Sequence, residues 1–397
     1  MKIFMSLLTI LILFPLYVHA EKPTVDAHGA ILMDAKTGRV LWGKKEHEPL
    51  AMASTTKIIT AVLALESGRM DETVTVSKRA AAAPKVKMNL VPGEKIRLGD
   101  LMMALMLESS NDAAVAIAEH LGGSVEDFCQ QMTEKAREIG AKDTVFETPN
   151  GLDAGNHHST AYDLAVITRY ALEVPGFITL TNTNSANFSS NKQSYSINNR
   201  NRLLHEYPGA NGVKTGFTNK AGHCFVGAAK RNIGGEEMQL ISVVLASGWG
   251  SKGRNQKYAD SKEILNYGFG NYKYETILTA KKEAGTLPVT RSRDKEINYI
   301  YNEGVRLPVT ADELNEITVE LYVPVSMKAP IHEGDAVGSA RVYVGGDFYA
   351  EVDLTATESA ARHDFKTSLE KIVNAFVGQI TDKEINIILP ELWQEDL

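Results

Sequence analysis

The segment 53–65, Ala-Ser-Thr-Thr-Lys-Ile-Ile-Thr-Ala-Val-Leu-Ala-Leu, constrains the fold of this chain more than any other. From Ile58 onward it is apolar on nearly every side, which predicts a buried helix. Ser54 is expected to cap that helix, and Lys57 follows three residues later on the same face. Burial disfavours the charged form of a lysine. An uncharged Lys57 beside the Ser54 hydroxyl would place a general base next to a nucleophile, as acyl transfer requires.

Ser-x-x-Lys is a weak signal when it stands alone, because two fixed positions in four recur by chance in a chain of 397 residues. The alternative interpretation of Ser54 is a purely structural helix cap. The rest of the sequence has to decide between the two.

The first twenty residues predict a cleavable secretory signal. They carry one cation, Lys2, then an apolar run at 3–16 and small residues ending at Ala20, so the mature chain is expected to begin at Glu21. The run is shorter than the roughly 20 residues of a spanning helix, and Pro15 interrupts it. A retained membrane anchor is therefore the less favoured interpretation.

Length and composition predict an ordinary globular protein with two domains. The formal net charge of −7 gives no electrostatic support to a nucleic-acid partner. Cys129 and Cys224 are the only cysteines, too few for a disulfide framework. Both are expected to be small buried residues, and their spacing leaves open whether they pair.

Strand patterns come early and late in the first 272 residues, with helices between them. Segments 29–33 and 39–42 predict a hairpin, and strands are expected from Val213, at 224–230 and at 238–246. Helical spacing and capping residues predict helices at about 99–107, 113–120, 124–139 and 160–172. This order predicts an α/β (α+β) domain with one sheet whose first and last strands adjoin, and an inserted helical lobe.

Beyond residue 272 the composition changes to short strands, which predicts a small all-β domain. Apolar and polar residues alternate at 317–323, and 341–344 is expected to pair with 348–354 across Gly345-Gly346. The tail from 363 shows an amphipathic helical stripe that could lie on a membrane or on protein. Its acidic residues outnumber its lysines, which argues against attraction to anionic lipid. Trp393 could still anchor it at an interface.

Three short motifs occur in order along the chain: Ser54-x-x-Lys57, Ser109-x-Asn111 and Lys214-Thr215-Gly216. Taken singly, each is more often a cap or a turn, but their joint occurrence resembles the penicillin-recognising serine enzymes. Three further segments resemble the low-molecular-mass D-alanyl-D-alanine carboxypeptidases in particular: Pro-Asn-Gly-Leu-Asp at 149–153, Ser-Thr-Ala-Tyr-Asp at 159–163 and Gly-Val-Lys-Thr-Gly-Phe-Thr at 212–218. The resemblance covers residues 28–272 closely and the β domain by architecture.

The resemblance implies a β-lactamase/transpeptidase-like catalytic domain at 21–272, after the signal at 1–20. A β-rich domain at 273–362 and the amphipathic tail at 363–397 would follow. Ser54 would attack the carbonyl between two D-alanines of a peptidoglycan stem peptide, and Lys57 would take its proton. Ser109 would relay a proton to the leaving amine, and Asn111 would hold Lys57 and the substrate amide. The positive charge of Lys214 would help to keep Lys57 neutral.

The third motif is implied to bind the end of the substrate. Lys214 and the Thr215 hydroxyl would hold its free carboxylate, and Gly216 would let its backbone approach the strand. The backbone N–H groups of Ser54 and Phe217 would form the oxyanion hole. Penicillins would be covalent inhibitors of an enzyme exported to the cell envelope. No cofactor is expected.

Several neighbouring residues are expected to have no catalytic part. Asn150 and Asp153 are interpreted as loop-forming, and Arg200 as a surface or substrate-side cation. His157 and His158 lack a third ligand at usable spacing, so a zinc site is not predicted.

Three alternatives remain open: a β-lactamase, a cross-link-cleaving endopeptidase and a non-catalytic cell-wall binding module. The β-lactamases that share these motifs have aspartate where Ser110 stands, and they use a loop glutamate to which the spacing of Glu147 does not correspond. The intact pair Ser54 and Lys57 argues against the binding module. The endopeptidase belongs to the same enzyme class and is harder to separate.

Overall fold

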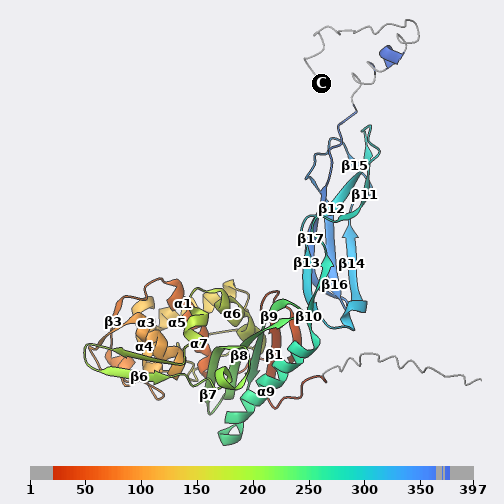
Figure 1. Cartoon of the computed structure of the whole chain (residues 1–397). Coiled ribbons are helices and arrows are strands. Elements are labelled where there is room, and N and C mark those ends of the chain that lie inside the picture. The colour runs from red at the N-terminus through yellow and green to blue at the C-terminus, as the bar shows by residue number, and fades with distance from the viewer. Residues whose placement is uncertain (1–20, 364–368, 370–371, 376–397) are drawn as a thin grey trace, which may run out of the picture. The chain divides into compact units, whose positions relative to one another are not determined.

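A computed structural model describes residues 21–363, 369 and 372–375 of the chain, which form two compact units (Figure 1). The first unit contains the residues up to Tyr274 together with Pro308–Thr310, and the second contains Glu275–Leu307 and the residues from Ala311 onward. The predicted signal at 1–20 and most of the predicted tail helix lie outside the described residues.

A five-stranded antiparallel sheet in the order β2-β1-β9-β8-β7 forms the middle of the first unit (Figure 1). Its strands are β1 (Gly29–Asp34), β2 (Val40–Lys44), β7 (Ala210–Thr218), β8 (Gly222–Ile233) and β9 (Glu236–Leu245). The predicted hairpin of β1 and β2 is confirmed, and so is the predicted pairing of the first strand with a late one, since β1 pairs with β9. Strand β7 is left at one edge.

Alternating side chains of this sheet enter two separate hydrophobic cores, because successive residues of a strand point to opposite faces. Leu32 and Leu240 pack with Leu265 of the long helix α9 (Gly250–Asn271) on one face. Ile31 and Met33 of β1 pack with the helical lobe on the other face. Helix α9 approaches closely at Gly268, where an added Cβ would lie 2.5 Å from Cδ1 of Leu240.

The helical lobe lies between the early and late strands in sequence, as predicted. Its helices are α1 (Lys57–Glu66), α2 (Lys78–Ala81), α3 (Leu98–Met103), α4 (Asn111–Gly122), α5 (Val125–Glu138), α6 (Ala161–Glu173), α7 (Phe177–Asn182) and α8 (Leu203–Glu206). Two hairpins flank them, formed by β3 (Thr73–Thr75) with β4 (Lys95–Arg97) and β5 (Ser185–Ser189) with β6 (Ser194–Asn198). The caps of α5 and α6 are confirmed, since Ser124 and Thr160 accept hydrogen bonds from backbone N–H groups three residues on.

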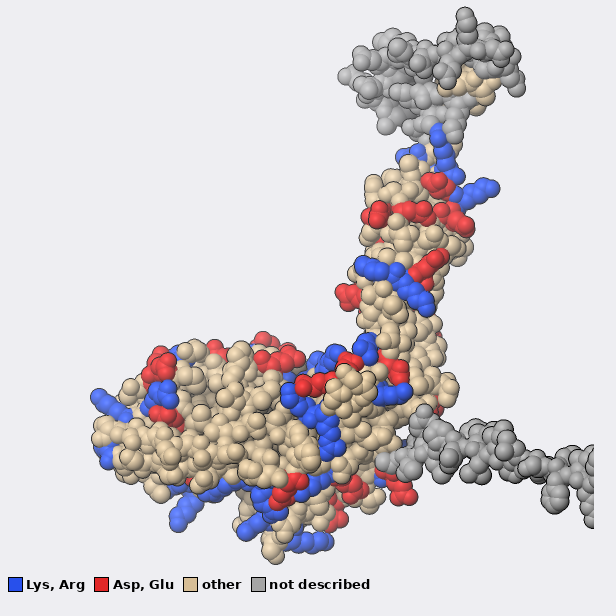
Figure 2. Space-filling model, in the orientation of Figure 1, with Lys and Arg blue, Asp and Glu red and all other residues tan. Residues whose placement is uncertain are grey.

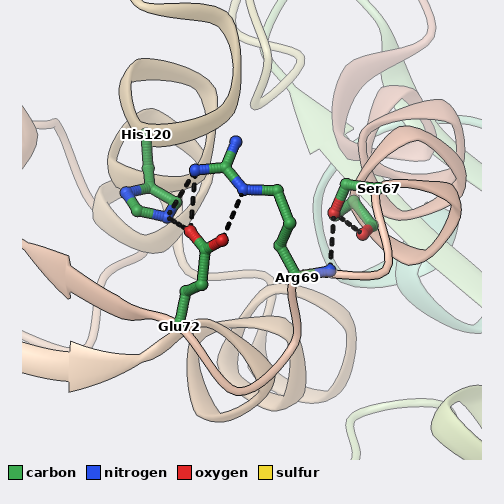
Figure 3. A network of polar contacts seen from close by, with 5 residues as sticks. Ser67, Arg69, Glu72 and His120 are labelled. Atoms are coloured by element: carbon green, nitrogen blue, oxygen red, sulfur yellow. Dashed lines mark hydrogen bonds and ion pairs between the residues drawn. The ribbon is translucent and has the colours of Figure 1, made fainter.

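A polar network joins the end of α1 to the end of α4 (Figure 3). The Ser67 hydroxyl accepts from the Arg69 N–H at 3.2 Å, and the Arg69 guanidinium donates to both carboxylate oxygens of Glu72 at 2.8 and 2.7 Å. His120 of α4 lies 2.8 Å from the same carboxylate. Hydrogen bonds from Arg69, and then from His120, lower the pKa of Glu72 to about 2. The network is largely exposed, so it orients the loop more than it stabilises the fold.

The second unit is all β, as predicted. A six-stranded sheet has the order β14-β16-β17-β12-β11-β15, and β10 pairs with β13 in a second sheet. The strands are β10 (Lys273–Leu278), β11 (Glu283–Thr290), β12 (Glu296–Tyr301), β13 (Val305–Val309), β14 (Ile317–Tyr322), β15 (Met327–Lys328), β16 (Ala336–Val344) and β17 (Asp347–Ala356), and a single turn η3 (Glu313–Glu316) precedes β14. The predicted hairpin across Gly345-Gly346 is confirmed by the pairing of β16 with β17.

Positive and negative side chains are interspersed on the face of both units drawn in Figure 2. No continuous cationic surface is seen on that face. Among the described residues, no helix combines the length and the apolar character needed to cross a bilayer.

Candidate active site

Ser54 and Lys57 lie at the junction of a single 3₁₀ turn, η1 (Ala53–Thr56), with helix α1. The predicted helix-capping role of Ser54 is wrong, because α1 begins at Lys57 and its N-cap, Thr56, makes no capping side-chain hydrogen bond. A 3₁₀ turn has three residues per turn, so side chains at i and i+3 eclipse each other. Nζ of Lys57 accordingly lies 3.1 Å from Oγ of Ser54.

Lys57 is fully buried, and three oxygen atoms surround its amine. Besides Oγ of Ser54, these are Oδ1 of Asn111 at 2.8 Å and the backbone carbonyl oxygen of Asn150 at 2.5 Å. Burial, and then the positive charge of Lys214, hold the pKa of Lys57 well below its usual value, against an opposing effect of Asp112. The predicted influence of Lys214 on Lys57 is thus present, but it is secondary to burial.

The neutral form of Lys57 fits this environment atom by atom. The oxygens of Asn111 and Asn150 can only accept, so they take the two N–H donors of an uncharged amine. In that form the lone pair would remain for Oγ of Ser54, 3.1 Å away, because the Ser54 hydroxyl is the one neighbour of the three that can donate a proton. The arrangement can therefore remove the hydroxyl proton without any movement of the backbone.

The loop at 148–153 contributes a carbonyl oxygen that the motifs did not indicate. Asn150 was expected only to shape the loop, yet its backbone oxygen contacts Lys57 and lies 3.4 Å from Oγ of Ser54. Every residue has a carbonyl group, so no residue type signals such a role. The available signal was Gly151, which has a φ of +81° and whose added Cβ would lie 1.9 Å from the carbonyl oxygen of Ala53.

The second motif follows a π-helical turn, η2 (Ala104–Glu108), that ends at Ser109 with a left-handed φ of 68°. This conformation turns the chain directly into α4, so Asn111 reaches Lys57. The Asn111 amide nitrogen donates to the carbonyl oxygen of Pro84 at 3.1 Å, which leaves one of its two N–H donors for another partner. Oγ of Ser109 is buried and has no hydrogen-bond partner within the described part of the chain. Ser109 therefore lies two residues before Asn111 in the sequence, but no hydrogen bond joins its hydroxyl to Ser54 or Lys57.

The third motif lies on the edge strand β7, which runs directly alongside the Ser54 turn. An added Cβ at Gly216 would lie 3.0 Å from the backbone nitrogen of Ser54, so the close approach that requires glycine here involves the protein itself and not only a substrate. Lys214 is 2% exposed and its Nζ donates to the carbonyl oxygen of Thr215 at 3.3 Å. Burial, then the charges of Lys257 and Arg200, lower the pKa of Lys214 to about 7.

Phe217 is 45% exposed, and its ring lies against that of His223 with centroids 4.4 Å apart. Its side chain thus lies against the neighbouring strand β8, where Phe217 pairs with His223. Arg200 is half exposed, 3.9 Å from Glu108. Asp153 accepts a hydrogen bond from the Thr218 hydroxyl at 3.0 Å, as a loop-forming residue would.

Neither cysteine forms part of the site. Cys129 and Cys224 are free and buried, and burial raises the pKa of their thiols to about 12 and about 11. Across the described residues, no three His, Cys, Asp or Glu side chains gather as they would to hold a metal ion. Glu147 is occupied within its own loop, where its carboxylate accepts from the Asn156 N–H at 3.1 Å.

Comparison with known families matches two consecutive models to this chain. The model of the peptidase S11 family, described as D-alanyl-D-alanine carboxypeptidase, matches residues 17–248. The model of the penicillin-binding protein 5 C-terminal domain matches residues 272–362.

Relatives and solved structures agree with these matches. The chain is 31% identical to the D-alanyl-D-alanine carboxypeptidase DacF of Bacillus subtilis over 353 residues, which cover 87% of this chain and 89% of the relative. It is 30% identical to DacC of Escherichia coli over 361 residues, 87% of each chain. The crystal structure of penicillin-binding protein 5 from Haemophilus influenzae superimposes with a TM-score of 0.71 at 27% identity, covering 86% of this chain and all of that one.

The contact between Gly151 and the Ser54 turn leads to a first prediction. Gly151→Ala should destabilise the protein clearly more than Gly123→Ala, as measured by urea unfolding. The two glycines have nearly the same positive φ, +81° and +80°, so alanine would be strained in the backbone at both positions. Only at Gly151 would the new methyl group meet backbone atoms, whereas Gly123 has nothing within 4 Å. Equal losses of stability would show that the loop is free to move away.

Proposed function

This chain belongs to the peptidase S11 family and is a D-alanyl-D-alanine carboxypeptidase, and we propose that it works through an acyl-enzyme on Ser54. The substrate would be the stem pentapeptide of peptidoglycan, and the product released would be its terminal D-alanine. The observation that carries the proposal is the position of Nζ of the buried Lys57, 3.1 Å from Oγ of Ser54 and 2.8 and 2.5 Å from two acceptor oxygens.

The proposed reaction begins with proton transfer from Oγ of Ser54 to Nζ of Lys57 as Oγ attacks the carbonyl carbon of the penultimate D-alanine. The C–N bond to the terminal D-alanine then breaks, and the leaving amine takes up a proton. Water attacks the resulting ester, loses a proton to the site and releases the shortened peptide, which regenerates the Ser54 hydroxyl. We infer that the N–H groups of Ser54 and Phe217 stabilise the oxyanion in both steps, because Gly216 lies directly beside the Ser54 nitrogen.

Asn111 and Ser109 would assist in different ways. Asn111 keeps one acceptor on Lys57 and has an N–H donor left for the substrate amide. A hydroxyl can accept and donate at the same time. The buried Oγ of Ser109, two residues before Asn111, is therefore suited to pass a proton to the leaving amine.

Lys214 and the Thr215 hydroxyl would hold the terminal carboxylate of the substrate. A cation next to an alcohol donor at an open strand edge suits a free carboxylate, which every carboxypeptidase substrate carries. Penicillins also carry a carboxylate beside a reactive amide, so they would acylate Ser54 and act as covalent inhibitors.

The rival functions make different demands on the site. A β-lactamase needs a base that activates water quickly at the acyl-enzyme, and the carboxylate of Glu147 is engaged by the Asn156 N–H. A binding module would need no neutral amine at a hydroxyl. An endopeptidase would use the same groups, so only the choice of substrate separates it from the carboxypeptidase.

A second prediction concerns the nucleophile. The unsubstituted protein should form a covalent adduct with a fluorescent penicillin, which survives denaturing electrophoresis, and Ser54→Ala should abolish it because no oxygen remains to be acylated. Ser251→Ala, an exposed serine on α9, is the matched control and should label normally. The adduct should turn over slowly; rapid release of hydrolysed penicillin would favour a β-lactamase, and no adduct on the unsubstituted protein would favour a binding module.

The same preparation should release free D-alanine from a stem pentapeptide, and Ser54→Ala should not. A cross-linked peptide dimer should be cleaved more slowly. Faster cleavage of the dimer would identify the endopeptidase as the main activity.

A third prediction follows from the pKa of Lys214. Its charge is present below pH 7 and is lost as the pH rises through its pKa of about 7, so kcat/KM should fall on the alkaline side. In Lys214→Arg the charge persists, and this alkaline limb should move up by at least about one pH unit, even if affinity falls. Lys252→Arg, a change at an exposed position, should leave the profile as it is. An unmoved alkaline limb in Lys214→Arg would assign the limb to another group.

We further propose that the enzyme is exported and acts at the cell envelope, where its peptidoglycan substrate is found. The amphipathic stripe of the tail would then lie on the outer face of the cytoplasmic membrane. Two of its apolar residues lie within the described part and are exposed: Leu369 at 39% and Ile372 at 64%.

A fourth prediction tests this attachment. The protein should float with lipid vesicles, and the double substitution Leu369→Glu and Ile372→Glu should reduce the bound fraction, because burying a charge in the lipid interface is unfavourable. Zwitterionic and anionic vesicles should bind it about equally, since the tail carries no excess of cations. If binding is unaffected by the substitutions, or absent, the stripe packs on protein instead.

A further inference from the structure

His157 is a buried histidine that none of the three motifs includes. It is 4% exposed, and both ring nitrogens have partners. Nδ1 accepts a hydrogen bond from the backbone N–H of Glu147 at 3.0 Å, and Nε2 lies 2.9 Å from Oγ1 of Thr56. Thr56 lies between Ser54 and Lys57 in the η1 turn.

The direction of each hydrogen bond follows from the chemistry of the partners. A backbone N–H can only donate, so Nδ1 of His157 carries no proton and Nε2 carries it. Nε2–H therefore donates to Oγ1 of Thr56, whose own hydroxyl proton goes to the carbonyl oxygen of Ala53 at 2.9 Å. The result is one continuous chain of donors from Glu147 through His157 and Thr56 to Ala53.

This chain ends on a strained part of the backbone. Ala53 has a φ of 49°, in the left-handed region that residues other than glycine seldom occupy. Such a conformation persists only where the surroundings hold it. The contact at Ala53 thus restrains the residue immediately before Ser54, and the contact at Thr56 restrains the residue immediately before Lys57.

The histidine stays neutral over the range in which the enzyme would work. Burial, then the positive charges of His158 and Lys220, lower the pKa of His157 to about 4. Its single N–H is accordingly on Nε2. The ring keeps the same protonation state and the same hydrogen bonds over this pH range.

We propose that His157 is a positioning residue, which holds the 53–57 turn through Thr56 so that Oγ of Ser54 and Nζ of Lys57 stay at reacting distance. This inference rests on the proposed roles of Ser54 and Lys57. His157 does not touch either side chain, and it acts only through Thr56 and Ala53. The loop at 147–157 therefore serves the site twice, with the carbonyl oxygen of Asn150 at Lys57 and with the ring of His157 below the turn.

The experiment compares three substitutions of His157 by their rate of acylation with a fluorescent penicillin. His157→Gln can place an amide N–H where Nε2 was, His157→Asn can only replace Nδ1, and His157→Phe replaces neither. We expect His157→Gln to stay within about threefold of the unsubstituted rate, and His157→Asn and His157→Phe to fall by about ten- to a hundredfold, as small misplacements of reacting groups do. In D-alanine release, the loss should be in kcat with KM nearly unchanged, because the substrate pocket is intact.

The pH dependence of the acylation rate provides a second measurement. The pH at which the rate falls on the acid side would not change through loss of stability alone. If the turn loosens, water reaches Lys57 and its pKa rises, so this acid limb should shift to higher pH in His157→Phe and His157→Asn but not in His157→Gln. The charged groups that act on Lys57, Lys214 and Asp112, are the same in all three variants.

Thr56→Val tests whether His157 acts through the Thr56 hydroxyl. It should slow acylation at least as much as His157→Phe, because it removes the hydrogen bond to Ala53 as well as the one from His157, and the double variant should be no slower than Thr56→Val alone. Thr168→Val, at an equally buried threonine on α6 whose hydroxyl bonds within its own helix, is the control and should retain the normal rate. Should His157→Phe fail to fold, Thr56→Val and the comparison of His157→Gln with His157→Asn still test the proposed role of His157.

Normal acylation and an unmoved acid limb in folded His157→Phe, or in Thr56→Val, would overturn the proposal, and so would additive losses in the double variant. These outcomes leave the proposed function standing. Absence of acylation in the unsubstituted protein would instead refute the role of Ser54 itself, and with it that of His157.

Discussion

The site depends on a lysine amine that is removed from water and surrounded by oxygen atoms. Burial makes the ammonium form of Lys57 costly, and the two acceptor oxygens of Asn111 and Asn150 compensate the two N–H groups of the neutral form. The lone pair is then directed at Ser54. A serine hydroxyl has no reactivity of its own at neutral pH, so the surroundings of this one amine make the proposed chemistry feasible.

Close backbone packing provides those surroundings. Two segments pack against the backbone of the η1 turn, the loop at Gly151 and the edge strand at Gly216, and Asn111 contacts Lys57 directly after the turn. At both glycines a methyl group would meet backbone atoms of the turn. A dry pocket needs such contacts, since water that entered would hydrate the amine and restore its usual pKa.

The topology of the sheet explains how segments 160 residues apart reach one another. Strand β1 comes before the Ser54 turn in the chain. In the sheet, β9 pairs with β1, β8 with β9 and β7 with β8, so β7 forms the edge of the sheet and lies beside η1. The helical lobe, inserted between, brings Asn111 and the 147–157 loop to the same turn. The edge strand of the sheet and a buried amine are thereby combined in one place, which would suit a peptide substrate that adds to the edge.

The sequence by itself determined the family, the order of strands and helices, and the residue types that meet at Lys57. Those conclusions rest on local information: the period of apolar residues, the capping signals of Ser124 and Thr160, and three motifs whose side chains are proposed to carry the chemistry. Tertiary structure alone decided that Ser54 lies in a 3₁₀ turn and caps no helix, that Gly216 is required by the nitrogen of Ser54, and that Asn150 contributes through its backbone. The proposed role of His157 is of the same kind. What a carbonyl oxygen or a buried ring can do depends on its position in the folded chain. That position is set by contacts between segments distant in sequence, and such contacts leave no pattern in the local sequence.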